Sequence, residues 1–206
     1  MKKIITLALI SFVLIASKAD AQLKKGEKML GGSIAISTQK SETEFPGFPA
    51  SETKQTSISI LPQLGFGLGS NWIAGINAGV NYTKAEEGTE TMKINIYTIG
   101  VFARKFHPVG ERFGFFGEAS AAYGRGTSKF ENASTKRNNT TFGVSVVPGA
   151  YFRANRRFII EAGIGGIQYL HAVSEPSNPN VPAKSTSDIF NFSLTDNLSL
   201  GFKVIL

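Results

Sequence analysis

The sequence predicts an all-β fold, an eight-stranded antiparallel up-and-down transmembrane β-barrel. Three observations predict it. Apolar and polar residues alternate along the chain, the links between the alternating stretches are long and short in turn, and aromatic residues recur ten positions apart. Successive side chains of a strand point to opposite faces of the sheet, so alternation gives a strand one apolar face and one polar face. We read the eight strands, in order, near residues 29–40, 54–68, 72–84, 91–106, 112–127, 139–152, 157–171 and 188–206.

The alternation identifies the strands of the first half of the chain. Between Ile58 and Leu68 the even positions are mostly bulky and apolar, and the odd positions are mostly Ser, Gln and Gly. Between Trp72 and Tyr82 the odd positions other than Ile73 are only Gly and Asn. Such regular alternation over more than eight residues is the pattern of a strand with two different faces.

The second half repeats the pattern. Even positions from Phe142 to Phe152 are apolar, and the last strand has eight apolar residues at its nine even positions from Phe190 to Leu206. Its polar exception is Asp196, which we place at the outer interface, so that residues 198–206 cross the membrane. The face opposite the bulky set consists mostly of Gly, Ser and Asn, which suit a narrow lumen better than a solvated exterior. The bulky set is therefore predicted to face lipid.

The segments that connect the predicted strands are alternately long and short. Three are short, at residues 69–71, 107–111 and 153–156, whereas four are longer and polar, at residues 41–53, 85–90, 129–138 and 172–187. Outer-membrane barrels have short periplasmic turns and long outer loops. The strict alternation therefore predicts both chain ends on the periplasmic side.

Aromatic spacing predicts the height of the lipid-facing band. Ten residues of strand rise about 33 Å, which a tilt near 40° reduces to about 25 Å, the distance between the aromatic girdles of such barrels. We assign to these girdles the pairs Trp72/Tyr82, Phe113/Tyr123 and Phe142/Phe152.

The first 21 residues are predicted to be a signal peptide. Lys2 and Lys3 precede an apolar run from residue 4 to 16, and Ala19-Asp20-Ala21 forms a cleavage site, so the mature chain begins at Gln22. Residues 22–206 form one predicted barrel domain located in the outer membrane. The chain has no cysteine, which excludes disulfides and a lipoprotein anchor.

The charge is mild. The signal peptide carries three Lys and one Asp, so its removal lowers the formal net charge from +7 to +5. No cluster of basic and aromatic residues suggests nucleic-acid binding. We expect the excess of positive charge to interact with the anionic groups of outer-membrane lipid and lipopolysaccharide.

Four charged residues fall on the predicted lumen face: Arg104, Glu118, Glu161 and Lys203. Buried charges need partners, because an unpaired one is costly. We expect an interior charge network that plugs the barrel. A ligand-binding cluster or a gated pore is the alternative.

No catalytic, cofactor-binding or metal site is predicted. His171 with Ser187 and Asp188 or Glu175 could imitate the His, Ser and carboxylate of a lipid-modifying enzyme at the outer leaflet, but polar loops bring such residues together by chance. The chain is therefore not expected to be an enzyme.

Several stretches resemble a known family, the outer-membrane β-barrel (porin-like) proteins of Gram-negative bacteria. They are residues 62–75, 148–158 and 163–166 and the terminal strand from Leu198 to Lys203. The resemblance covers essentially the whole mature chain and implies export and barrel-assembly machinery as partners. Family members commonly end in an aromatic residue, whereas this chain ends in Leu206. We expect a structural or surface-interaction role, with a small-solute porin or a soluble ligand-binding barrel as alternatives.

Overall fold

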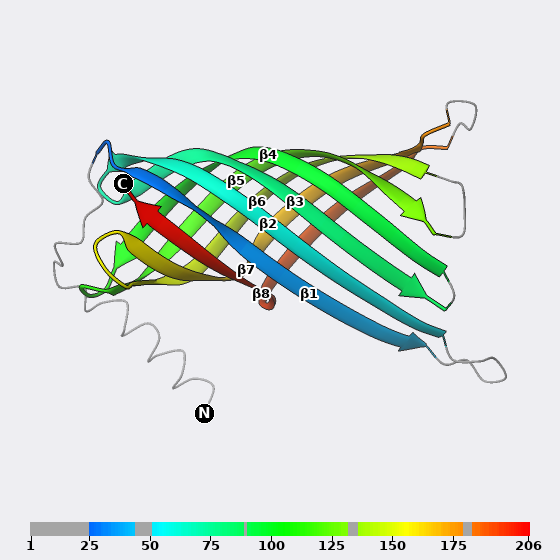
Figure 1. Ribbon diagram of the computed structural model, residues 1–206, viewed down its shortest axis with the longest axis horizontal. Coiled ribbons are helices and arrows are strands. Elements are labelled where there is room, and N and C mark those ends of the chain that lie inside the picture. Colours follow the sequence, from blue (N-terminus) through cyan, green and yellow to red (C-terminus); the bar gives the residue numbers. More distant parts are fainter. Residues whose placement is uncertain (1–24, 44–50, 89, 132–135, 179–182) are drawn as a thin grey trace.

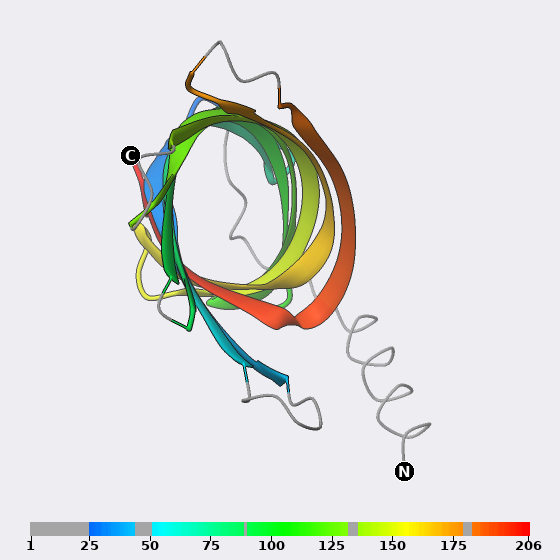
Figure 2. The ribbon, with the colours of Figure 1, turned by 90° about the vertical axis from the view of Figure 1, so that its right-hand side faces the viewer.

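The protein is a closed β-barrel (Figures 1 and 2). The computed structural model describes residues 25–43, 51–88, 90–131, 136–178 and 183–206. Within them lie eight strands: β1 (Lys28–Thr43), β2 (Ser51–Gly69), β3 (Trp72–Glu87), β4 (Glu90–Pro108), β5 (Phe113–Phe130), β6 (Lys136–Arg153), β7 (Phe158–Pro176) and β8 (Ser185–Ile205). The described residues include no helix long and apolar enough to span a membrane. The predicted signal peptide and its cleavage site between Ala21 and Gln22 lie outside the described residues.

The topology is the predicted one. Each strand pairs antiparallel with the next, and β8 pairs with β1 to close the ring. The start of β1 and the C-terminal residue meet at the short-turn end, where the Lys28 amide donates to the Leu206 carbonyl over 3.2 Å and the Leu206 amide donates to the Lys28 carbonyl over 2.8 Å. The prediction of an all-β antiparallel barrel is confirmed.

The strands are longer than predicted at the end that carries the long links. The β7 strand, for example, continues to Pro176 instead of ending at residue 171. The four predicted long links, 41–53, 85–90, 129–138 and 172–187, shorten to residues 44–50, 88–89, 131–135 and 177–184. Alternation finds only strands that have one apolar face, whereas backbone pairing continues through hairpins that are polar on both faces.

The backbone angles of the turn between β2 and β3 explain why this turn is short. The turn consists of Ser70 and Asn71, with φ of 50° and 62°. Two-residue hairpins of this kind need positive φ at both central positions, and Asn adopts that conformation more readily than most residues.

The bulky apolar set faces outward. Ile76, Val101 and Phe202 are 55%, 57% and 61% exposed, whereas Gln63 and Asn77 on the other face are buried. A surface covered with exposed aliphatic and aromatic side chains suits lipid rather than water. The side chain of Asp196, the predicted exception, lies outside the part that the structure describes.

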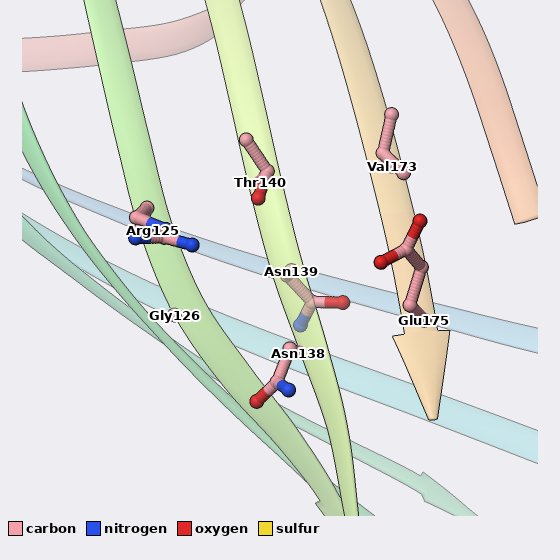
Figure 3. A pocket seen from close by; sticks show the side chains of 7 residues that line it. All are labelled: Arg125, Gly126, Asn138, Asn139, Thr140, Val173 and Glu175. Atoms are coloured by element: carbon pink, nitrogen blue, oxygen red, sulfur yellow. The ribbon is translucent and has the colours of Figure 1, made fainter. Parts of the chain in front are cut away.

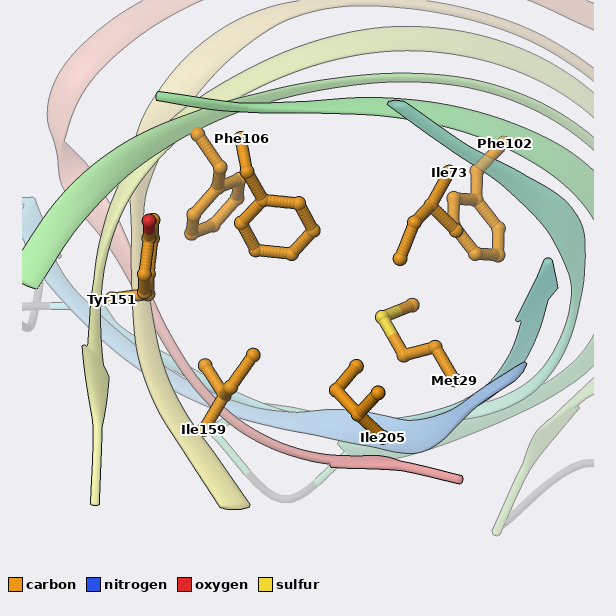
Figure 4. Close-up of a cluster of buried hydrophobic side chains, with 8 residues drawn as sticks. Met29, Ile73, Phe102, Phe106, Tyr151, Ile159 and Ile205 are labelled. Atoms are coloured by element: carbon orange, nitrogen blue, oxygen red, sulfur yellow. The ribbon is translucent and has the colours of Figure 1, made fainter. Parts of the chain in front are cut away.

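The interior differs from the predicted one at the short-turn end. Eight buried apolar side chains meet there and fill the barrel (Figure 4): Met29, Ile73, Phe102, Phe106, Phe116, Tyr151, Ile159 and Ile205. We call them the apolar layer. The expectation of a lumen filled mostly by Gly, Ser and Asn is wrong for this part, because a small barrel closes only where bulky side chains fill it.

Two irregularities interrupt the sheet near β6, β7 and β8. The β6–β7 register shifts between Val146 and Gly149, beside Pro148. The β7–β8 register shifts between Ile164 and Gly166, where Gly165 and Gly166 have φ of 52° and 133°. Proline cannot donate to the ladder, and extra residues bulge out of it, so both features bend the wall locally.

Candidate functional site

Five polar side chains form a ring across the barrel; four are buried, and the side chain of Glu118 is 11% exposed. The five are Gln63 of β2, Arg104 of β4, Glu118 of β5, Glu161 of β7 and Lys203 of β8. We call them the interior charged ring. Five of the eight strands contribute, so the ring links walls that are far apart in the sequence.

Strand register brings the ring members together. Arg104 lies directly opposite Glu118 in the β4–β5 ladder. Glu161 lies opposite Gly201 in the β7–β8 ladder, and Lys203 follows two positions along β8 on the same face. The ring is thus a product of alternation and register, and none of its members comes from a loop.

Arg104 forms hydrogen bonds with the carboxylates of both Glu118 and Glu161. Its Nε donates to Glu118 Oε2 over 2.8 Å, and its Nη2 lies 2.6 Å from the same oxygen. Its Nη1 pairs with Glu161 Oε2, and its Nη2 donates to Glu161 Oε1 over 3.2 Å. A planar guanidinium with five donors can serve two carboxylates at once.

Lys203 and Gln63 close the ring. Lys203 Nζ lies 3.0 Å from Glu161 Oε1 and donates to Gln63 Oε1 over 2.6 Å. Gln63 Nε2 then donates to Glu118 Oε1 over 3.0 Å. Each of the five side chains therefore bonds two others, and the amide of Gln63 connects a cation to an anion.

Burial and charge balance explain why all five are needed. The side chains of Lys203, Arg104 and Glu161 are 0%, 3% and 4% exposed. Two cations face two carboxylates, so the ring is neutral overall. Burying a charge without a partner costs several kcal/mol, and only a complete set of partners offsets that cost.

The apolar layer lies directly against the ring. The Arg104 guanidinium is 4.3 Å from the ring centroid of Phe116 and 5.5 Å from that of Phe106. Phe106 in turn meets Tyr151 edge-on, with 5.1 Å between centroids. Cation–π contacts of this kind are strengthened when water is excluded. The two layers therefore lie side by side inside the barrel, with the apolar layer toward the short-turn end.

Glycines make room for the ring. A Cβ at Gly201 would lie 2.6 Å from Glu161 Oε1 and 2.7 Å from its Cγ. A Cβ at Gly31 would overlap the backbone and the Cδ of Lys203. At these two positions, any larger residue would displace a charged side chain.

The structure brings together all four charges that the sequence placed in the lumen. Asn77, on the same face, lies outside the ring, and its Oδ1 has no hydrogen-bond partner among the described residues. Sequence reasoning missed the aromatic members of the apolar layer, Phe102, Phe106, Phe116 and Tyr151. A signal existed, because they share the inward parity of Arg104, Glu118 and Gly149 on their strands.

The predicted girdle residues lie on the outer surface in two rows. Phe113 is directly opposite Phe152, and Tyr123 is directly opposite Phe142, in the β5–β6 ladder. Trp72 begins β3 at the short-turn end, where Lys105 Nζ lies 5.1 Å from its ring centroid. Tyr82 lies ten residues further along β3, beside Ile58.

A polar cavity of about 310 Å³ lies near the outer ends of β5, β6 and β7 (Figure 3). Its lining is Arg125, Gly126, Asn138, Asn139, Thr140, Val173 and Glu175. Guanidinium, amide, hydroxyl and carboxylate groups gather there without an apolar floor. Such a lining suits a ligand rich in hydroxyl or phosphate groups.

The residues weighed for catalysis are only partly brought together. His171 Nδ1 lies 2.8 Å from Asp188 Oδ1, to which Tyr169 Oη also donates over 2.6 Å. Ser187 is next to Asp188 on β8 and so projects from the opposite face. Glu175 lies 3.5 Å from Lys184 instead. Within the described part of the chain, no group of three or more His, Asp or Glu residues could hold a metal ion.

Sequence comparison now identifies the family. The model of the outer membrane protein beta-barrel domain matches residues 5–202. The chain belongs to this family. The barrel is thus an outer-membrane protein, with transmembrane strands whose apolar faces meet lipid. Among curated proteins, none matches the chain.

Solved structures of outer-membrane proteins are similar to the chain at low sequence identity, and one of them has a TM-score above 0.5. The outer membrane protein OprG from Pseudomonas aeruginosa is 10% identical, with 90% of this chain and 98% of that chain covered and a TM-score of 0.52. Neisserial surface protein A (NspA) is 14% identical, with 87% and 96% covered and a TM-score of 0.45. Ail, the attachment invasion locus protein of Yersinia pestis, is 12% identical, with 89% and 97% covered and a TM-score of 0.36.

Proposed function

We propose that this outer-membrane barrel does not conduct solutes and serves a structural or surface-interaction role. The observation that carries the proposal is the filled interior. An open pore needs a continuous aqueous path, and the apolar layer and the interior charged ring both lie across the lumen. Eight-stranded barrels are narrow enough for side chains alone to close them.

The ring supports a permanent plug rather than a gate. Each member has two partners, so opening a path would break several charge-assisted hydrogen bonds together and expose unpaired charges. The apolar layer adds a second barrier, because aromatic side chains exclude ions even where water enters.

The outer end supports the surface role. The hairpins continue as strands beyond the aromatic rows and carry ion pairs such as Lys93 with Glu131, 2.6 Å apart, and Lys40 with Glu52, 3.1 Å apart. Their polar faces and the cavity around Arg125 suit the sugars and phosphates of lipopolysaccharide. The export and barrel-assembly machinery are the other partners in this proposal.

In this role the protein performs no chemical reaction. His171 has a carboxylate beside it, but Ser187 projects from the opposite face of β8. A nucleophile and its base must lie within hydrogen-bond reach of each other.

Conductance in planar bilayers tests the plug. Purified, refolded wild-type protein should show no stable open-channel current. A variant with Phe106→Ala, Phe116→Ala, Glu118→Ser and Arg104→Ser removes parts of both layers and should conduct, provided that it folds. Heat-modifiable gel mobility checks folding of both proteins. A large, stable current from wild-type protein would replace the plug by a pore.

A further inference from the structure

The ring of strands is not closed along its whole length. Pairing between β1 and β8 ends at Ala35 and Ser199 after seven residue pairs, whereas every other pair of neighbours shares 14 to 17. Beyond that point β1 and β8 diverge toward the outer end (Figure 1). In the outer part of the barrel, the segments 36–43 of β1 and 185–192 of β8 therefore have ladder partners on one side only.

These segments are ordered strand edges. β1 stays paired with β2 up to Thr43 and Ser51, and β8 stays paired with β7 from Ser185 and Ser174 onward. All residues from Ile36 to Glu42 and from Ser185 to Phe192 are exposed. We call these two segments the open β1 edge and the open β8 edge. An exposed edge with free N–H and C=O groups is a template for another strand.

We propose that a second copy of this chain docks at these edges, so that the open β1 edge of each copy pairs with the open β8 edge of the other. All copies enter the membrane in the same orientation. β1 rises toward the outside and β8 descends, so the two edges meet antiparallel when one copy is rotated by half a turn about the membrane normal. Such an arrangement is a closed, two-fold dimer.

In one register, apolar side chains of the two edges face each other and opposite charges face each other. If Ile36 pairs with Phe192, two exposed apolar side chains meet near the membrane, and Lys40 falls opposite Asp188 near the outer end. Even residues point outward on both strands, so apolar faces continue into apolar faces and lumen faces into lumen faces. Opposite charges directly across an antiparallel pair are favourable.

The register shift between β7 and β8 brings the two edges closer to the same depth. Ile36 and Leu198 are the first residues beyond the last β1–β8 pair. From Leu198 to Phe192, β8 advances past only three residues of β7, Ile164 to Ile167, because the register shifts there. Phe192 therefore lies three residues of strand above Ile36, about 10 Å along the strand, instead of the six that the numbering of β8 alone would give.

Lys40 and Asp188 can each form a further hydrogen bond in addition to those within their own copy. Lys40 Nζ lies 3.1 Å from Glu52 within its own copy, and an ammonium has three donors. Asp188 Oδ1 is held by Tyr169 and His171, and Oδ2 provides further acceptor sites.

Cross-linking between separately marked chains tests the dimer. The native chain has no cysteine, so Lys40→Cys and Asp188→Cys can be placed in two differently tagged copies that are co-expressed. A short bismaleimide should join the two tags in intact outer membranes. Lys129→Cys, at the outer end of β5 and paired on both sides, is the control partner and should give no cross-link with Asp188→Cys.

Three results would decide the matter. Cross-linking of the two tags supports the dimer. A chain carrying both Lys40→Cys and Asp188→Cys that cross-links only within itself would show that each barrel closes its own seam, and it would overturn the proposal. Absence of any cross-link, with normal heat-modifiable mobility of all variants, would also overturn it.

Charge reversal gives a second measurement. With cysteines moved to Ile36 and Phe192, Lys40→Glu should lower the yield of cross-linked dimer about threefold, because it places like charges across the pair. Adding Asp188→Lys should restore the yield. An unchanged yield in Lys40→Glu would remove the proposed register.

Discussion

At the scale of single residues, the interior charged ring makes stability depend on balance more than on any one contact. Glu161 bonds Arg104 and Lys203, so its carboxylate compensates two buried cations. The ring as a whole carries no net charge. Loss of one member is therefore expected to cost more than loss of a neutral pair.

Glu161→Ala should lower the free energy of unfolding by about 3–5 kcal/mol, because it leaves the buried ammonium of Lys203 without a carboxylate partner. The double variant Glu161→Ala with Lys203→Ala keeps Arg104 paired with Glu118 and should lose less than the single variant. Urea titrations of folded protein in micelles, read by gel mobility, give both values. Strictly additive losses would show that the side chains do not act together.

Gly31 tests the space that the ring requires. Gly31→Ala should destabilise the barrel by about 1–3 kcal/mol, because its Cβ would overlap the backbone and side chain of Lys203. Gly117→Ala is the matched control, since a Cβ at that strand position meets nothing within 4 Å. Equal unfolding midpoints for the two variants would show that Lys203 can move aside.

At the scale of the strand, the two faces meet different solvents. Ile76 and Asn77 are neighbours on β3, yet one is 55% exposed and the other 4%. The first meets lipid and the second the lumen. A substitution therefore has a different cost on each face.

Ile76→Arg should cost about 2–4 kcal/mol in bilayer refolding, since it places a charge in the middle of the lipid-facing band. Ile58→Arg places the same charge on the same face, beside Tyr82 at the outer aromatic row. It should cost only about 0–1 kcal/mol, because charge is tolerated near the interface. Two similar losses would contradict the assigned depth of these rows.

The alternation of apolar and polar residues was sufficient to predict the strands and their faces, because successive side chains of any strand point to opposite faces of the sheet. The same parity placed Arg104, Glu118, Glu161 and Lys203 inside. It could not predict how far the polar hairpins extend, since neither of their faces is apolar. The partial seam between β1 and β8 was also beyond reach, because it depends on the register shift at Gly166, which alternation does not encode.

At the scale of the whole molecule, the two ends of the barrel differ. The start of β1, the C-terminal residue Leu206, the short turns and the apolar layer lie at one end. The polar hairpins, the open edges and the cavity around Arg125 lie toward the other. A surface role requires that this second end faces the outside of the cell.

Single cysteines test this orientation, because the native chain has none. Ser177→Cys, beyond the outer end of β7, should react with an impermeant maleimide on intact cells. Ser70→Cys, in the turn between β2 and β3, should react only after lysis, because short turns of such barrels lie in the periplasm. Both residues are exposed, so a difference in labelling reports the membrane side and not burial. Labelling of Ser70→Cys alone on intact cells would invert the barrel, and would place the apolar layer and Leu206 toward the outside.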